Sequence, residues 1–215
     1  MEHAYAVESR LKKWLGSQEP IDKYFRKKVY YFRNYLTTEQ TDPARNIVIS
    51  RYGSSAGPIF DEALAHLNPF TVFTEAEFQQ VTDTVFSLNG TVFTGSDVCE
   101  TLRASTFVFP HIISSGKEIE EYALEKTDSM SRKIIRELCR VANTAGRELM
   151  IQVLVDKYNI TEMLALVPGA PGWELQEGNR IFEMFEKETD EAGIYVTSKG
   201  LPNVAYTAFG LMIGN

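Results

Sequence analysis

The sequence predicts an α+β fold in which an antiparallel or mixed sheet packs against a long central helix, with further helices at the N-terminus. Three observations lead to this prediction. Helical and strand patterns are mixed along the 215 residues without regular βαβ alternation. Apolar residues recur every three or four positions over one long stretch that begins after Asp128. The first 36 residues carry the same helical spacing.

The N-terminal part of the chain predicts two helices followed by a connection. Gly16 is placed to end the first helix, and Pro20 suits the first turn of the second, which runs to Leu36. The polar stretch 37–45 indicates a connection. We therefore expect an N-terminal helical extension, residues 1–45, and an α+β domain, residues 46–215.

The middle of the chain alternates between strand and helix patterns that are separated by turn-forming residues. Asn89-Gly90 predicts a tight turn, and Ser114-Ser115-Gly116 leads into a further short helix. The expected strands are 46–52 and 105–113, and the expected helices are 59–67, 75–86 and 96–103.

The longest predicted element is a helix that starts after Asp128, an expected N-cap, and approaches 30 residues at Tyr158. Gly146 in its middle would normally weaken a helix, so it predicts a close contact with the sheet or a kink. An apolar run then ends at Pro168-Gly169. A helix, a short strand at 193–198 and a second strand rich in small residues complete the pattern.

Composition and charge exclude several functions. A net charge of −7 and a pI of about 5.1 do not suit a general nucleic-acid binder. The longest apolar run is far too short to span a bilayer, so we expect no membrane partner. Cys99 and Cys139 lie far apart, which indicates free thiols in a reducing cytoplasm. The three histidines form no local set of metal ligands.

One motif is typical of serine hydrolases. Gly53-Ser54-Ser55-Ala56-Gly57 satisfies GxSxG and lies between an expected strand and an expected helix, as a nucleophile elbow does. A hydrolase that uses Ser55 also needs a histidine base and an acid. No histidine follows His111, although the hydrolase order places the base late in the chain. A glycine-rich turn and a serine hydrolase are the two interpretations.

The stretch from Arg10 to Asn34 is strongly basic and rich in aromatic residues, whereas the rest of the chain is acidic. This asymmetry suits docking onto an acidic partner. The alternative is an ordinary helical face with its lysines in water and its aromatic residues buried.

The most specific pattern lies between Leu164 and Gly210. Ala165 to Ala170 ends in Pro-Gly-Ala, Trp173 and Leu175 follow, and 193–202 combines Ile-Tyr-Val-Thr-Ser with Leu-Pro. This order resembles the activation domain of cobalamin-dependent methionine synthase, which has an R-x-x-P-G-Y loop, a W-x-L sequence and an "IGV-x-LTES" strand. The resemblance covers roughly residues 70–215.

The resemblance implies a function. Domains of that family bind S-adenosylmethionine and methylate cobalamin that has been oxidised by accident, with an electron from a flavodoxin-type reductant. The expected partner is therefore a corrinoid protein or a cobalamin-dependent methyltransferase that carries the cobalamin, and no catalytic residue is expected in this chain. The implied positions for S-adenosylmethionine or a related ligand are Ala165, Pro168, Gly169, Ala170, Thr197, Ser198 and Pro202.

This chain departs from the family at three of those positions. Ala165 replaces the arginine that pairs with the methionine carboxylate, Ala170 replaces the tyrosine, and Ser198 replaces the glutamate of T-E-S. Loss of such a charge-assisted pair costs about 1.5–3 kcal/mol, or about ten- to a hundredfold in affinity. Lys199 is a weaker single-point substitute. An alternative function is therefore a non-catalytic module that docks a corrinoid protein without binding S-adenosylmethionine.

Overall fold

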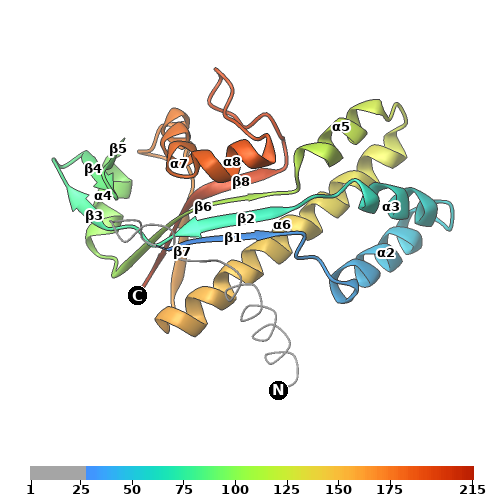
Figure 1. The fold of residues 1–215 in the computed structure, drawn as a ribbon, viewed down its shortest axis with the longest axis horizontal. Coiled ribbons are helices and arrows are strands. Elements are labelled where there is room, and N and C mark those ends of the chain that lie inside the picture. Colours follow the sequence, from blue (N-terminus) through green and yellow to red (C-terminus); the bar gives the residue numbers. More distant parts are fainter. Residues whose placement is uncertain (1–27) are drawn as a thin grey trace.

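The structure, a computed structural model, describes residues 28–215 and has the predicted α+β class. A five-stranded antiparallel sheet forms its centre. Helix α6 (Ser129–Tyr158) crosses one face of this sheet, and α7 (Gly178–Met184) and α8 (Glu186–Ala192) lie on the other (Figure 1). Within residues 28–215, no helix combines the length and the apolar character that crossing a lipid bilayer needs.

The central sheet has the strand order β1-β2-β6-β8-β7. Strands β6 and β8 pair along eight residues, from Phe107 opposite Gly214 to Ser114 opposite Thr207, and they carry the middle of the sheet. The edges are β1 and the short β7. The strands are β1 (Val29–Arg33), β2 (Phe70–Thr74), β6 (Phe107–Ser114), β7 (Met163–Leu166) and β8 (Thr207–Gly214).

The predicted long helix is confirmed. The carboxylate of Asp128 accepts a hydrogen bond from the Ser131 backbone N–H at 2.7 Å, so it caps the first turn of α6. Asn159 ends the helix in the left-handed conformation, with φ of 53°. Further helices are α2 (Thr38–Tyr52), α3 (Ala56–Ala65), α4 (Ser96–Arg103), α5 (Lys117–Glu125) and the short 3-10 helix η1 (Leu175–Glu177).

Gly146 lies where α6 approaches the sheet most closely. A Cβ atom at this position would collide with the hydroxyl groups of Thr71 and Tyr35 and would stand 2.8 Å from a methyl carbon of Ile113. The Tyr35 hydroxyl also donates a hydrogen bond to the Ala142 carbonyl at 3.0 Å. The predicted close contact between helix and sheet is therefore confirmed, and it explains why glycine is present despite its cost in a helix.

Buried side chains fill both sides of the sheet. Trp173 and Phe209 belong to the group under α7 and α8, whereas Phe73 belongs to the group between the sheet and α6. A third group around Phe60 joins α2, α3 and α5 to the first half of α6. Each large side chain buried in this way contributes about 1.5–3 kcal/mol.

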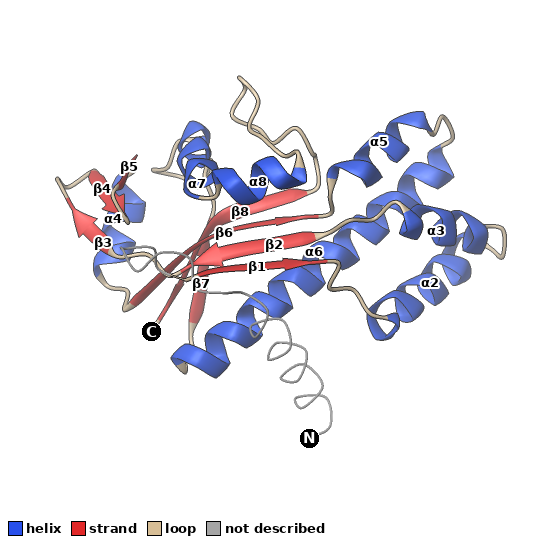
Figure 2. Ribbon diagram, in the orientation of Figure 1, coloured by secondary structure: helices blue, strands red, loops and turns tan. Residues whose placement is uncertain are grey.

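The helix expected at 75–86 is wrong. A separate three-stranded sheet occupies this region, with β3 (Phe78–Gln80), β4 (Val85–Leu88) and β5 (Thr91–Thr94) (Figure 2). The predicted turn at Asn89-Gly90 is confirmed, since it joins β4 to β5 with positive φ at both residues. Phe78 and Phe86 pack against each other across β3 and β4.

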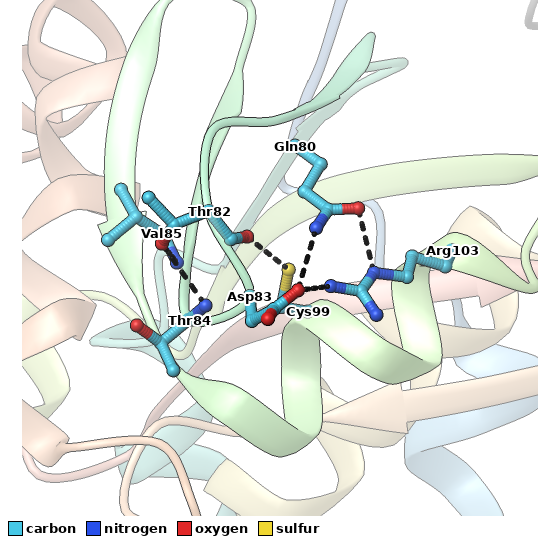
Figure 3. A network of polar contacts seen from close by, with 7 residues as sticks. All are labelled: Gln80, Thr82, Asp83, Thr84, Val85, Cys99 and Arg103. Carbon is cyan, nitrogen blue, oxygen red and sulfur yellow. Dashed lines mark hydrogen bonds and ion pairs between the residues drawn. The ribbon is translucent and has the colours of Figure 1, made fainter.

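Polar contacts hold the turn between β3 and β4 (Figure 3). The Thr82 hydroxyl accepts hydrogen bonds from the backbone N–H groups of Thr84 and Val85, at 3.3 and 3.0 Å. Arg103 of α4 donates to the side chains of Gln80 and Asp83, both at 2.8 Å. These bonds favour a turn over the helix that the apolar spacing predicted.

The connection expected at 37–45 and the strand expected at 46–52 are also wrong, because α2 covers both. The Thr37 backbone N–H donates to the Gln40 side chain at 2.9 Å, as at a helix start. Ala44, Val48 and Tyr52, spaced four residues apart, pack in one group with residues of α3 and α6 while Ile47 remains exposed, which is a helical period. The helices expected at 59–67 and 96–103 and after Gly116 are confirmed as α3, α4 and α5.

The end of the second predicted N-terminal helix is a strand. In β1, Tyr30 and Phe32 face α6, whereas Val29 and Tyr31 face the opposite side, which is the two-residue period of a strand. The rest of the expected N-terminal helices, with most of the basic stretch, lies outside the described residues. Because β1 pairs with β2, the chain joins the sheet before residue 45.

Candidate functional site

The turn after β7 is rigidly built. Pro168 is buried, and Gly169 has φ of 93°, which few other residues adopt. The Gly169 N–H donates to the Trp173 carbonyl at 2.8 Å, and the Trp173 N–H donates to the Ala170 carbonyl at 3.0 Å. Trp173 is only 2% exposed and anchors the turn in the core.

The second predicted segment, 197–202, forms another tight turn. The backbone N–H and the hydroxyl of Thr197 both donate to the Leu201 carbonyl at 2.8 Å. The strand expected at 193–198 is wrong, because the segment makes only one isolated bridge, between Val196 and Pro202. The Asn203 side chain accepts a hydrogen bond from the Tyr195 N–H at 2.8 Å and donates one to the Gly193 carbonyl at 3.1 Å, so a side chain satisfies these backbone groups in place of a neighbouring strand.

The short helix η1 brings these two turns together. The Cβ position of Gly169 lies 3.5 Å from the Leu175 side chain, and that of Gly200 lies 3.6 Å from the Gln176 Cα. Both turns are therefore on the side of the sheet that carries α7 and α8 (Figure 1). The structure thus groups the predicted residues Pro168, Gly169 and Ala170 with the segment that holds Thr197, Ser198 and Pro202.

Ala165 is separate from that group. It lies in the edge strand β7 directly opposite Met212 of β8, and opposed residues of antiparallel strands share a face. Met212 packs in the group beneath the sheet with residues of α6, as does Met163, two residues before Ala165. The exposed Ala165 side chain therefore points toward the α6 side.

The two turns have few charges that could hold an anionic ligand. Glu177 accepts hydrogen bonds from the backbone N–H and hydroxyl of Thr94, at 2.8 and 2.6 Å, so it fastens η1 to β5. Arg180 is paired with Glu183 at 3.0 Å. Lys199 is exposed and makes no hydrogen bond or ion pair with residues 28–215.

Apolar side chains at the rim of these turns are open to water. Val167 is 51%, Leu201 50% and Tyr195 61% exposed. The sequence analysis did not predict that these three side chains are exposed. Apolar residues beside Pro-Gly and Gly-Leu-Pro turns can nevertheless indicate exposed apolar surface. The rim of the two turns is therefore apolar, and Lys199 is its one cation without a partner among residues 28–215.

The strand that a nucleophile elbow requires before Ser55 is absent. Ser55 lies in the turn between the helices α2 and α3, so the strand predicted before GxSxG is wrong. His66 stacks on Tyr122, with ring centroids 4.2 Å apart, and His111 is buried in β6. Neither imidazole makes a hydrogen bond to Ser55. His3 lies outside the described residues.

Comparison with known proteins adds one result. No family model matches this chain, and no curated protein matches it. Among solved structures, the crystal structure of the MetH reactivation domain bound to AdoHcy matches with a TM-score of 0.57 and 14% identity, covering 93% of this chain and 82% of that chain. The chain has the fold of that reactivation domain. At this identity the likeness shows the fold, and it supports the structural relationship that the pattern at 164–210 suggested.

Proposed function

We propose that this protein binds S-adenosylmethionine or a related adenosyl ligand beside β7 and assists the reductive methylation of a corrinoid protein. The observation that carries the proposal is the reactivation-domain fold, which extends over 93% of the chain and occurs in a structure that contains AdoHcy. Pro168 and Gly169 stand where the family's loop has proline and glycine, and the turn that they form here supports the same location.

The chain's own residues would position the ligand. Pro168 and Gly169 fix the path of the turn, and the exposed Val167, Tyr195 and Leu201 offer apolar surface at its rim. Bound S-adenosylmethionine would supply the activated methyl group, so the task of the protein is orientation.

The proposed partner carries the cobalamin, and a flavodoxin-type protein supplies the electron. The exposed apolar rim suits a protein partner, because such surface is buried when two proteins associate. A cytoplasmic location is part of the proposal and is supported by Cys99 and Cys139, which are both buried and free.

Calorimetric titration tests ligand binding. We expect the wild-type protein to bind AdoHcy and S-adenosylmethionine, and Gly169→Val to weaken both, since a β-branched residue cannot adopt φ of 93° without strain. Leu124→Ala, on the exposed outer side of α5, is the matched control and should bind like wild type. No heat of binding from wild type at millimolar ligand would disprove this part of the proposal.

A second function is favoured by the alanine at position 165. Without the family's arginine, the same fold can serve as a module that docks a corrinoid protein and binds no adenosyl ligand. In that case the cobalamin domain of a methionine synthase should bind the wild-type protein and lose binding to Val167→Asp, which places a charge on the apolar rim. Equal binding by the two proteins would exclude docking through this rim.

A further inference from the structure

Helix α6 carries a row of cations on its outward face. Its buried residues, among them Ile135, Leu138 and Ala142, recur at three or four positions and face the rest of the protein. The exposed positions between them hold five cations, which we call the cationic row: Arg132, Lys133, Arg136, Arg140 and Arg147. At about 3.6 residues per turn, all five lie within about a third of the helix circumference, over a length of about 22 Å.

Hardly any carboxylate balances the cationic row. Between residues 129 and 147 of α6 there is one acidic residue, Glu137. It lies at the flank of the row, where it pairs with Arg140 at 3.3 Å and with Arg51 of α2 at 3.2 Å. The row therefore remains positive, although the whole chain has a net charge of −7.

The cationic row works against the stability of the helix that carries it. Arg132, Arg136 and Arg140 are spaced four residues apart, and like charges at this spacing repel each other. Cations are also unfavourable near a helix start, because the N-terminal end of the helix dipole is positive. The first turn of α6 nevertheless contains no acidic residue. A solvated helix face with ion pairs usually alternates charges of both signs, so a row of one sign indicates a role other than folding.

The cationic row is accessible and lies away from the two turns of the candidate site. Lys133 and Arg147 are exposed and make no hydrogen bond or ion pair with residues 28–215. The Arg140 side chain is 71% exposed despite its pair with Glu137. Helix α6 and the pair α7 and α8 lie on opposite faces of the central sheet (Figure 1). A partner bound to the row would therefore leave the turns at 168–170 and 197–202 open.

We infer that the cationic row docks an acidic segment of another protein. Four of its five cations are arginine, whose planar guanidinium binds a carboxylate through two parallel hydrogen bonds. A segment with carboxylates repeated along one face can meet the row over its whole length. This inference goes beyond the proposed function and does not depend on an adenosyl ligand.

Two other polyanions fit the surface less well. The rest of the chain has an excess of acidic residues, which repels a long nucleic acid that extends beyond the row. An anionic membrane is bound most firmly where apolar side chains enter the lipid beside the cations. The large exposed apolar residue of α6 is Val155, which lies beyond the end of the row.

Binding of labelled peptides, measured by fluorescence anisotropy, tests the inference. The probe is a peptide of about 15 residues with glutamate at every third or fourth position, long enough to span the row as a helix. A peptide with glutamine in place of glutamate is its uncharged counterpart. At low ionic strength we expect the wild-type protein to bind the glutamate peptide, to release it as salt is added, and to ignore the glutamine peptide.

Charge reversal locates the binding surface. Lys133→Glu and Arg147→Glu should each weaken binding of the glutamate peptide about tenfold, because an attraction becomes a repulsion. Both substitutions replace exposed side chains that make no hydrogen bond or ion pair with residues 28–215. Lys187→Glu makes the same charge change at an exposed position of α8 and is the matched control, which should bind like wild type.

Several results would overturn the inference. These are no binding of the glutamate peptide by wild type at low ionic strength, and equal binding by wild type and the Lys133→Glu/Arg147→Glu double variant. Tighter binding of a duplex DNA of similar length, or of vesicles of phosphatidylcholine and phosphatidylserine, that is lost in the double variant would assign the row to nucleic acid or to lipid instead. The proposed function stands in each of these cases, since AdoHcy binding is measured separately and involves the other face of the sheet.

Discussion

The buried His111 predicts a specific pH dependence of stability. Burial in the core lowers the pKa of this imidazole from 6.5 to about 4, and the charge of Arg147 adds to the effect. The side chain is only 4% exposed, and its Nδ1 lies 3.4 Å from the Phe109 carbonyl, a long hydrogen bond. The folded protein therefore keeps His111 neutral at pH values where the unfolded chain protonates it.

The sign and size follow from proton linkage. As the pH falls below 6.5, the unfolded state takes up a proton that the folded state refuses until about pH 4, so the free energy of unfolding decreases over this window. Each pH unit within this window lowers the free energy of unfolding by about 1.4 kcal/mol. Between neutral pH and pH 5, His111 should thus remove about 2 kcal/mol of stability.

Urea denaturation at pH 7.5 and pH 5.0 measures this contribution. We expect wild type to lose about 2 kcal/mol more between the two pH values than His111→Leu, in which the titrating group is absent. The substitution also changes the packing around residue 111 and therefore the absolute stability. This effect cancels when the change in unfolding free energy between the two pH values is compared for the two proteins. Equal losses in the two proteins would refute the reasoning, as would an NMR titration of His111 with a midpoint near 6.5.

Three other substitutions have defined outcomes. Gly146→Ala should lower the free energy of urea unfolding by about 1–3 kcal/mol, despite a gain of about 1 kcal/mol in helix propensity, because the new methyl group meets the Tyr35 hydroxyl. Tyr35→Phe should recover part of the loss, and a net stabilisation would contradict the packing argument. Asp128→Ala should lower the melting temperature at neutral pH. The hydrogen bond from Ser131 holds the pKa of Asp128 below its usual value, so the stabilisation by this carboxylate is lost as the pH falls through that pKa. A difference in melting temperature between wild type and Asp128→Ala that persists at pH 2 would show that the carboxylate does not cause it. Ala165→Arg should leave the AdoHcy affinity in calorimetry unchanged, because position 165 faces the α6 side, away from the two turns. A gain of about ten- to a hundredfold would show that the ligand carboxylate lies on that side of the sheet.

The sequence was most informative where one long periodic pattern agreed with clear end signals. Asp128, the repeating apolar positions and Gly146 together predicted α6 and its contact with the sheet. Predictions from the sequence were wrong where tertiary contacts override the local pattern of apolar residues. Residues 46–52 are rich in β-branched side chains and were predicted as a strand, yet packing on α3 and α6 makes them helical. Residues 75–86 have helical spacing, yet the contacts of Thr82 and Arg103 stabilise a turn.

The candidate site was predictable only in part. The Pro168-Gly169 turn was predicted from sequence because proline and glycine restrict the backbone directly. The opposite orientation of Ala165 follows from the pairing register of β7 with β8, which no local pattern reveals.

The position of β8 also constrains how the protein is made. This strand lies between β6 and β7, and both of them precede it in the chain. Until residues 207–214 have left the ribosome, β7 has no neighbour and β6 has one open edge, so a nascent chain carries unsatisfied backbone groups and apolar surface. Closure of the sheet therefore follows the synthesis of all its other strands, and a chain that stops before β8 exposes surface that chaperones and proteases recognise.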